Sequence, residues 1–547
     1  MLGKEVEILP RPHKSKPLFA VTWAFPNSYE VGMSSLGYQL VWWLMESNPE
    51  VKVSRAFTDC AEMGWDESEL IGFTLSWELD YVNILRFLQK SRVANIASDR
   101  QDNQPLVFGG GPVLSANPEP FAEFFDVILL GDAEVSVPKL LDAWIKVRAI
   151  AGRKQQLLAL AQIDGFYIPS LYQYKLTANE GPIACIEPIC VDAPQKIIKQ
   201  AFAPPPSYVA HSLLLAPDTT FGDMFLIEIA RSCPQECRFC LASYLSRPFR
   251  AANIDSIVEK IDLGLKHTSK IGLLGPSVTE HPEFDRRADA LIARPHTQIS
   301  IASIRADTIN QLVLEMLVKL GQKSVTIALE SGSERLRAIM KKNLTEEQIT
   351  SAVDLIAASG LKGLKFYGVV GLPGEKQDDL DETIKLITKL KKKHKHLRIV
   401  LGLSSFVPKA QTPFQWSGRD PKSQEKLQYI DKRLSKLGIQ VRPESHNWSD
   451  IQALLSRGDR RLTPLLEKVA LGNANIGSWH NALRHLPDGC PSEKYYVYRT
   501  IPYEETLPWS HLIDAPKQGM LIRHSHNAEQ LAASTAKTVH ETTKGHL

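Results

Sequence analysis

The sequence predicts an α/β protein in which two series of alternating strands and helices are followed by a mixed helical region. Three observations lead to this prediction. Short apolar runs alternate with amphipathic, helix-length segments through residues 1–150, a clearer alternation occupies residues 223–415, and a Pro-rich stretch separates the two. Strands that alternate with helices form parallel sheets. We therefore expect a doubly wound parallel sheet first and a partial (β/α)6 barrel second.

The composition is that of a globular protein with several domains. The chain has 547 residues, 44% of them hydrophobic and 23% charged, with a formal net charge of +3. This charge favours neither nucleic acid nor a membrane surface as a partner. No apolar run is long enough to span a bilayer, and the first residues, MLGKEVEILPRPHKSKP, lack the apolar core of a secretory signal. We therefore expect a cytoplasmic protein that binds neither a membrane nor nucleic acid.

The first alternation contains a run of glycines at a strand end. The expected strands are LFAVTWAF (18–25), VKVSRAFT (51–58), LIGFTLSW (70–77), PLVFGGG (105–111) and DVILLG (126–131). Ligands of doubly wound sheets bind at the carboxyl ends of the strands. Gly109, Gly110 and Gly111 stand at such an end, which makes this edge a candidate binding site.

The rest of the chain divides into four further parts. We expect connecting strands and a Pro-rich linker over residues 151–222, the barrel over 223–415, a mixed C-terminal domain over 416–523 and a disordered polar tail over 524–547. Six barrel strands are expected, and the helix that begins after Thr345 has a capping-box pattern with Gln348. The six strands are MFLIEIA (224–230), KIGLLG (270–275), TQISIAS (297–303), SVTIALE (324–330), LKFYGVVG (364–371) and RIVLGLS (398–404).

Three of the seven cysteines fall inside ARSCPQECRFCLASY (230–244), directly after the first barrel strand. Cys233, Cys237 and Cys240 have the spacing C-x3-C-x2-C. Each iron of a 4Fe–4S cluster takes a terminal thiolate, so three cysteines would leave one iron open for a substrate or cofactor. Zinc would require a fourth protein ligand, and no histidine lies nearby. Three inert buried thiols are the remaining alternative, which the polar residues of this loop disfavour.

The C-x3-C-x2-C loop, with the aromatic residue Phe239 before the third cysteine, resembles the radical S-adenosylmethionine (SAM) superfamily. The resemblance implies that the methionine group of SAM binds the open iron. It further implies that one electron from the cluster cleaves SAM to a 5′-deoxyadenosyl radical, which abstracts a hydrogen atom. An electron donor such as flavodoxin or ferredoxin is then required, and Phe239 is expected beside the adenine.

Segments at the ends of the later strands resemble the cofactor contacts of the same family. LGPS stands where the family often has Gly-Gly-Glu, which meets the amino group of SAM, and GVVGLPGE is similar to its adenine-side motif. The candidate residues are Gly275, Ser303, Arg305, Glu330, Gly371 and Pro373. Ser303 and Arg305 suit the carboxylate of SAM. From the residues alone, Glu330 could instead cap the following helix, and GLPGE could form a turn.

The first domain resembles the cobalamin-binding domain that precedes the barrel in many radical SAM enzymes. The similar segments are GFTLSWELD and FGGGPVLSANPEPFAEFFDVILLGDAE. The resemblance makes Ser76, Gly109, Gly110 and Gly111 candidate contacts. Cobalt-ligating members have D-x-H-x-x-G after the first strand, where this chain reads AFPNSYEVGMSSLG without a histidine. Either cobalamin binds without a protein histidine, or the domain keeps the fold without the cofactor.

We therefore expect a radical SAM enzyme that acts on a small molecule or peptide. With cobalamin, it would methylate an unactivated carbon; without cobalamin, cyclisation, rearrangement or oxidation is expected. The alternative from another class is a non-catalytic iron–sulfur or nucleic-acid-binding protein on the same scaffold. Methylthio transfer is disfavoured, because relatives with that activity have a second three-cysteine cluster and Cys60 is the only cysteine of the first domain.

Three further patterns leave two interpretations each. KLKKKHKHLR (389–398) is interpreted as a solvated helix face rather than a phosphate site. Cys185 and Cys190 are interpreted as strand cysteines rather than as metal ligands. RGDRR (457–461) is interpreted as a salt-bridge network rather than a grip on an anionic substrate.

Overall fold

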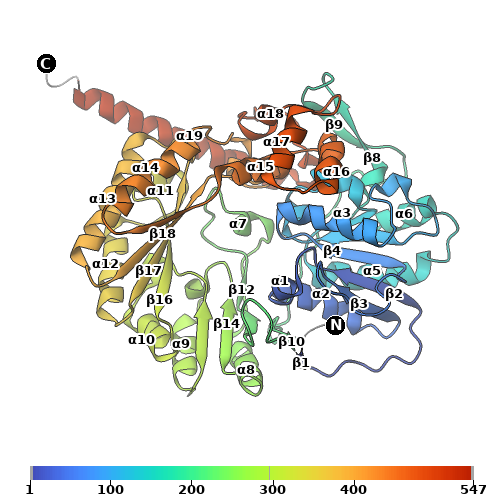
Figure 1. Cartoon of the computed structure of the whole chain (residues 1–547), viewed down its shortest axis with the longest axis horizontal. Helices are drawn as coiled ribbons and strands as arrows, with labels where there is room; N and C mark the ends of the chain where they lie inside the picture. The colour runs from blue at the N-terminus through green and yellow to red at the C-terminus, as the bar shows by residue number, and fades with distance from the viewer. Residues whose placement is uncertain (1–3, 295, 544–547) are drawn as a thin grey trace.

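The computed structural model describes residues 4–294 and 296–543. Two sheet-bearing halves lie side by side, and the C-terminal helices run across one end of both (Figure 1). The N-terminal half contains the doubly wound sheet, and the other half contains the parallel strands of the barrel. The predicted fold class is confirmed.

The N-terminal sheet has the order β3-β2-β4-β5-β6-β7. Its strands are β2 (Phe19–Ala24), β3 (Val51–Ala56), β4 (Leu70–Thr74), β5 (Leu106–Gly110), β6 (Val127–Leu129) and β7 (Phe166–Tyr167). All pairs are parallel except β6 with β7. The strand order reverses at β2, next to β4, which is where ligands bind in such sheets. The sheet extends to residue 167, beyond the expected boundary at 150.

Helices cover both faces of this sheet, as the alternation predicts. Helices α2 (Leu36–Glu46) and α5 (Ala133–Val147) pack together on one face, and α3 (Tyr81–Lys90) lies on the other (Figure 1). Helix α16 (Thr463–Leu471) from the C-terminal region packs on α3. A helix of the C-terminal region therefore packs on the outside of the first domain.

The barrel half contains seven parallel strands. They are β11 (Phe225–Glu228), β14 (Lys270–Leu274), β15 (Gln298–Ile301), β16 (Ser324–Glu330), β17 (Gly363–Val370), β18 (Arg398–Ser405) and β19 (Gln440–Pro443). A parallel bridge between Ile304 and Ile327 joins the first three to the last four. The six expected strands are present. Strand β19 was missed, because its sequence QVRP has almost no apolar pattern.

Helices on the outside separate these strands along the chain. They are α8 (Ile254–Leu265), α9 (Phe284–Ile292), α10 (Gln311–Lys319), α11 (Glu334–Ile339), α12 (Glu346–Ala358), α13 (Gln377–Lys393) and α14 (Ser423–Ser435). Helix α12 begins with the predicted capping box of Thr345 and Gln348. The strands and helices bury a common aliphatic core.

Residues 151–222 connect the two halves. They contain α6 (Arg153–Ala161), the antiparallel hairpin β8 (Tyr172–Leu176) and β9 (Ile183–Pro188), and the short strand β10 (Leu214–Leu215), which pairs with β1 (Val6–Glu7). A long stretch without regular structure precedes β10, as the Pro-rich sequence indicates.

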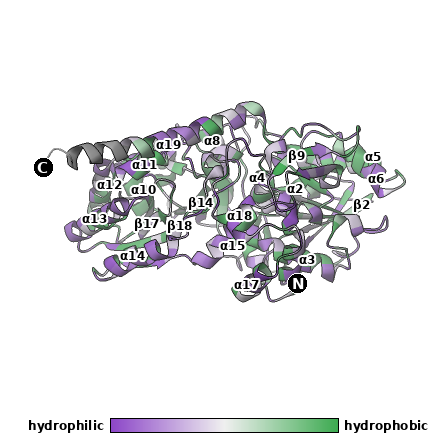
Figure 2. Cartoon of the chain, turned by 90° about the horizontal axis from the view of Figure 1, so that it is seen from above, coloured by the Kyte–Doolittle hydropathy of each residue, from purple (hydrophilic) through white to green (hydrophobic). Residues whose placement is uncertain are grey.

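The C-terminal region is helical, and one prediction for it is wrong. Its helices are α15 (His446–Arg457), α16, α17 (Ile476–Arg484), α18 (Glu493–Val497) and the long α19 (Ala515–Thr543). Residues 524–543 of the expected disordered tail belong to α19, which runs along one side of the molecule (Figure 2). Leu521 and Ala528 are buried although most of the helix is polar, so a few apolar contacts hold it. Residues 544–547 lie outside the described residues.

Every helix in the described part of the chain is too short or too polar to cross a membrane.

Candidate functional site

The three-cysteine loop lies between β12 (Ala230–Arg231) and α7 (Leu241–Leu245). Cys237 is buried, and Cys233 and Cys240 are half-buried. Two non-glycine residues of this segment, Ser232 and Glu236, have positive φ angles of 67° and 54°. Such residues are uncommon and are held by their surroundings. The surrounding structure therefore holds this loop in a fixed conformation, which buries Cys237 and leaves the other two cysteines partly buried.

Hydrogen bonds hold the loop from two sides. The Tyr244 hydroxyl donates to the Glu236 carbonyl at 2.7 Å, and the Lys341 ammonium pairs with the Glu236 carboxylate at 2.6 Å. The Arg238 backbone donates to the Met340 carbonyl at 2.9 Å, and its guanidinium donates to carbonyls at the end of α11. The loop is thus fixed to the segment that follows β16.

The thiols are in mutual electrostatic contact. The pKa of Cys237 is raised to about 12, chiefly by burial; Lys342 lowers it, and Cys240, Glu330 and Cys233 raise it. Burial likewise raises the pKa of Cys233. Among described residues, no three His, Cys, Asp or Glu side chains are arranged to hold a single metal ion. A 4Fe–4S cluster distributes its thiolates over separate irons, so its ligands do not have to converge on one point.

Glu330, at the end of β16, forms a buried ion pair beside Cys237. Its carboxylate lies 3.1 Å from the Lys342 ammonium, and the two side chains are 9% and 8% exposed. Burial lowers the pKa of Lys342, but Glu330 and Cys237 raise it more. Glu330 has a φ of 63° and adjoins a bulge in the pairing of β16 with β17. A strained residue at a strand end indicates a functional position.

A second set of charges lies on the other side of the loop. Arg305 follows β15 and contacts Asp307 at 2.8 Å and Glu280 at 3.6 Å. One Glu280 oxygen accepts from the Gln235 amide, while the other is buried without a hydrogen-bond partner among described residues. The Ser277 hydroxyl is also buried without a hydrogen-bond partner among described residues. Buried unsatisfied groups are rare in folded proteins, and here two of them follow β14.

Sequence reasoning missed Glu280, which stands a few residues past β14, and Lys342, which follows α11. Both have charge contacts with the cysteines: Glu280 raises the pKa of Cys233, and Lys342 lowers that of Cys237. The only signal in the sequence was an acidic or basic residue in the loop after a barrel strand. Many such loops contain one, so the fold was needed to find them.

The other predicted SAM contacts lie at the same end of the strands. Phe239 packs against an apolar cluster formed by α11 and the segments after β17 and β18. Gly371 has a φ of 76°, and its N–H donates to Glu375 at 2.7 Å. Gly275 lines a cavity of about 480 Å³ between β14, the loop and α2. Ser303 is half-buried beside Arg305, and Pro373 is half-buried after Gly371.

A cavity of about 310 Å³ occupies the carboxyl edge of the N-terminal sheet; we call it the edge cavity. Gly110, Gly111 and Ser76 line it, as expected of candidate contacts, together with Leu245 and Ser246 from the barrel half. Gly109 does not: a Cβ there would lie 2.6 Å from Phe125, in the core. The edge cavity therefore lies between the two halves, beside α7.

Charged residues join the two halves at the wall of this cavity. Arg231, next to the cysteine loop, pairs with Glu134 at 2.7 Å and Asp132 at 3.1 Å, both at the start of α5. Arg250 pairs with Asp132 at 2.9 Å. Since these side chains are largely buried, the ion pairs fix the cysteine loop relative to the sheet edge.

The structure shows the surroundings of the three segments for which the sequence allowed two interpretations. In 457–461, Arg460 pairs with the buried Glu119 at 2.7 Å, and Arg461 pairs with Asp459 at 2.7 Å, as expected of a salt-bridge network. Lys393 of the basic run pairs with Asp354 on the exposed outside of the barrel. Cys185 lies in β9 and Cys190 just after it, both half-buried.

Two family models match the chain, one on each half. A model described as "Radical SAM proteins, N-terminal" matches residues 42–169, and one described as "Radical SAM superfamily" matches residues 227–387. The second match begins just before the cysteine loop and includes β11 to α13.

The chain belongs to the radical SAM superfamily. It is a radical SAM enzyme, and its fold implies a 4Fe–4S cluster and SAM as cofactors. The enzyme is 29% identical over 448 residues to an uncharacterised protein of Methanocaldococcus jannaschii; the match covers 81% of the enzyme and 89% of that protein. It is 26% identical over 310 residues to an uncharacterised methyltransferase of Pyrococcus horikoshii, with 54% of the enzyme and 61% of that protein covered.

Among solved structures, this radical SAM enzyme is similar to TsrM, a radical SAM methyltransferase of Kitasatospora setae solved with cobalamin and a 4Fe–4S cluster. The TM-score is 0.50 at 14% identity, and the match covers 71% of the enzyme and 74% of TsrM. At this identity the similarity establishes a shared fold.

Proposed function

We propose that the enzyme holds its 4Fe–4S cluster through Cys233, Cys237 and Cys240 and binds SAM next to it, in order to make a radical on a substrate held between the two halves. The observation that carries this proposal is the gathering of charged side chains around the three cysteines. Three of them follow or end three successive strands, and the fourth follows α11; they are Glu280, Arg305, Glu330 and Lys342.

These residues complement the two charges of an amino acid group. Arg305 and Lys342 offer cations to a carboxylate, and Glu280 and Glu330 offer carboxylates to an ammonium group. The methionine part of SAM has both groups. When bound, the cluster supplies the electron that cleaves SAM to the 5′-deoxyadenosyl radical. The partly unpaired Glu280 and Ser277 would gain partners.

The protein also shields this region from water. Arg305, Glu330 and Lys342 are all less than a tenth exposed, and Phe239 packs beside the loop on an apolar cluster. Exclusion of water strengthens the charge contacts and prevents a reactive species from reacting with solvent. We propose a small electron-transfer protein, such as flavodoxin or ferredoxin, as the donor.

We further propose that the edge cavity binds a corrinoid and that the enzyme transfers a methyl group. The observation in favour is the position of this cavity at the carboxyl edge of a doubly wound sheet, with α7 of the cysteine loop as its opposite wall. Gly110 leaves room for a flat ligand to approach the backbone. The residues that line the cavity include no histidine, so the protein offers no imidazole to cobalt here.

The Cys237→Ala variant tests the proposal. After anaerobic reconstitution it should hold less iron and sulfide and lose the absorbance of the cluster. With dithionite and SAM it should yield no 5′-deoxyadenosine or S-adenosylhomocysteine. Cys60→Ala is the matched control and should keep both properties, because Cys60 lies far from the loop in the N-terminal half. Unchanged product formation in a cluster-free Cys237→Ala protein would refute the proposal. An intact cluster without either product in the unmodified enzyme would favour a non-catalytic iron–sulfur protein.

A further inference from the structure

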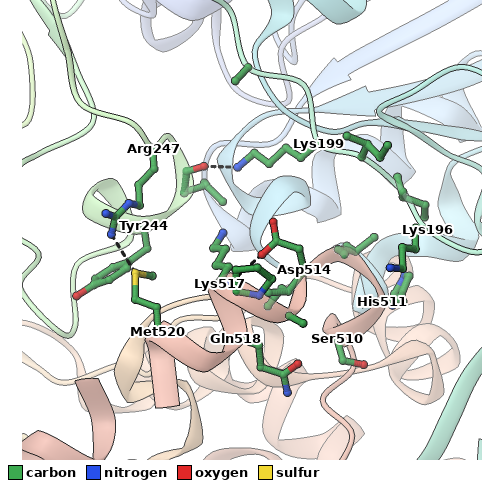
Figure 3. A pocket seen from close by; sticks show the side chains of 18 of the residues that line it. Lys196, Lys199, Tyr244, Arg247, Ser510, His511, Asp514, Lys517, Gln518 and Met520 are labelled. Carbon is green, nitrogen blue, oxygen red and sulfur yellow. Dashed lines mark hydrogen bonds between the residues drawn. The ribbon is translucent and has the colours of Figure 1, made fainter. Parts of the chain in front are cut away.

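One large cavity in the described part of the chain has no role in the reaction as proposed so far. It has a volume of about 960 Å³ and lies where three segments meet: residues 195–201, the end of α7 and the start of α19. Figure 3 shows side chains from all three segments around it. We call it the α19 cavity. Its size is at the upper end of the range for ligand pockets.

Only a thin wall separates this cavity from the edge cavity. Lys199, Leu245, Ser246 and Asp132 line both. The Lys199 ammonium donates to the Leu245 carbonyl and so forms part of the wall (Figure 3). A molecule in the α19 cavity would therefore lie next to the end of the helix that follows Cys240.

Two lysines of this cavity form no ion pair with a described residue. Lys199 donates to a carbonyl, and Lys517 donates to the Gln411 side-chain oxygen at 2.6 Å. Both are neutral acceptors, and neither lysine forms an ion pair with a described residue. Burial and then Lys517 lower the pKa of Lys199 to about 7, and burial lowers that of Lys517 to about 8. The buried position of each lysine therefore disfavours its charged form.

The acids of the cavity wall compensate these charges only in part: Asp132 raises the pKa of Lys199 and Asp514 raises that of Lys517, but burial outweighs both. Asp132 is occupied by Arg231 and Arg250. Asp514 accepts from the backbone N–H of Lys517 at 2.7 Å and caps the start of α19. The positive end of that 29-residue helix also faces the cavity. The wall therefore has a surplus of positive charge.

A buried histidine with an unsatisfied ring nitrogen gives a second, independent indication of a ligand. His511 lines the cavity with a side chain that is only 8% exposed, and its Nδ1 has no hydrogen-bond partner among described residues. Its Nε2 faces Glu119 at 3.4 Å. A buried ring nitrogen without a partner is costly, and a polar group of a bound molecule would satisfy it.

The remaining wall is apolar. Its main contributors are Ile186, Ile197, Leu512, Ile513 and Met520. Apolar surface around a few convergent polar groups is typical of a site for an organic molecule rather than for an inorganic ion alone.

We propose that the α19 cavity binds an organic anion, with a carboxylate or phosphate between Lys199 and Lys517 and an apolar body against the aliphatic wall. This step rests on the proposed function, and the anion would be the substrate of that reaction. A bound anion would supply the direct ion pair that both lysines lack. It would also place the apolar part of the substrate beside α7 and the edge cavity.

The test is calorimetric titration of the full chain with its cluster reconstituted, using octanoate in one arm and inorganic phosphate in the other. At least one probe should bind saturably, and the probe that binds identifies the anionic group. The double variant Lys199→Gln/Lys517→Gln should bind it roughly tenfold or more weakly. Lys392→Gln on α13 removes the same charge from an exposed position and should bind as the unmodified enzyme does.

Equal affinity in the double variant, or no saturable binding of either probe by the unmodified enzyme, would overturn the proposal. Iron content and near-ultraviolet circular dichroism of each variant show whether it is folded. Reductive cleavage of SAM is measured on the same samples without a probe. Cleavage without anion binding rejects the anion site alone, whereas anion binding without a cluster or cleavage rejects the radical SAM function alone.

Discussion

Glu330 is the residue whose backbone and side chain are both unusual. It has a φ of 63° at the end of β16, and its carboxylate is buried against Lys342. A non-glycine residue in this conformation costs about 1–3 kcal/mol, which the surrounding structure must offset. A helix cap would not need this conformation or this partner, since Ser333 caps α11. The site contact is therefore the better interpretation of Glu330.

Replacing Glu330 with Gln should weaken SAM binding by about tenfold, because the ammonium group of SAM would lose a carboxylate partner. The variant also leaves Lys342 without its ion-pair partner. Equilibrium dialysis of the reconstituted protein with SAM measures the effect, and cluster content should stay unchanged. Glu334→Gln in the exposed first turn of α11 is the matched control. Equal affinity for SAM in Glu330→Gln would contradict the assigned role.

At this scale, the sequence predicted the cysteines and the strand-end residues but not their partners. The cysteines have a spacing that only a metal site explains well, and Arg305 and Glu330 directly follow apolar runs. Glu280 and Lys342 lie in loops without a pattern, and only the parallel arrangement of β14, β15 and β16 brings them to one place. The unpaired state of Lys199 and Lys517 likewise depends on contacts far apart in the sequence.

The turn from β5 to α4 (Pro112–Ala116) is the element that shapes the edge cavity. Gly111 has a φ of 101°, and a Cβ there would lie 2.8 Å from the Leu75 carbonyl oxygen, so a side chain cannot be accommodated. Gly110 differs, because its Cβ would lie 3.6 Å from the nearest atom, the Leu129 oxygen. A side chain introduced at position 110 can therefore enter the edge cavity without straining the backbone of the turn.

The Gly110→Leu variant should bind hydroxocobalamin at least about tenfold more weakly, because the added side chain occupies the edge cavity. Anaerobic incubation, gel filtration and a visible spectrum measure the bound corrinoid. Cluster content and reductive cleavage of SAM should be retained, since neither depends on Gly110. If the unmodified enzyme binds no corrinoid, or if the variant binds as much as it does, the edge cavity is not a corrinoid site.

At the scale of the whole molecule, one buried network joins the N-terminal sheet to the C-terminal region. The Glu119 carboxylate accepts from Arg460 at 2.7 Å and from the Tyr167 hydroxyl at 2.5 Å. Burial alone would raise the pKa of Glu119, but Arg460 and His511 lower it to about 2. The pattern of apolar residues predicted both regions as separate domains. The apolar pattern could not predict that the two regions pack together, because polar residues form the network that joins them.

Replacing Glu119 with Gln should lower the free energy of unfolding at pH 7 by about 3 kcal/mol. The carboxylate of Glu119 is ionised in the folded state above pH 2 and in the unfolded chain above its usual 4.5. Its stabilisation is therefore fully present above pH 4.5 and is lost as the pH falls towards 2. Urea unfolding at a series of pH values measures the difference between variant and unmodified protein.

The difference should shrink as the pH falls below 4.5. Glu123→Gln, on the same 3-10 helix as Glu119 (Glu119–Phe124), is the matched control and should show little change. A deficit in Glu119→Gln that stays constant from pH 7 to pH 3 would show that the charge of Glu119 does not contribute.

The position of α19 has a consequence for biosynthesis. Its His524 lies 3.2 Å from the Tyr244 hydroxyl that fixes the cysteine loop, and the helix packs on α11, to which Arg238 of the loop is bonded. A ribosome releases the loop long before it releases α19. The cysteines are therefore exposed on the nascent chain without part of their final support. Under the proposed function, cluster assembly on the finished protein would use a loop that α19 already supports, whereas assembly during translation would use an unsupported loop.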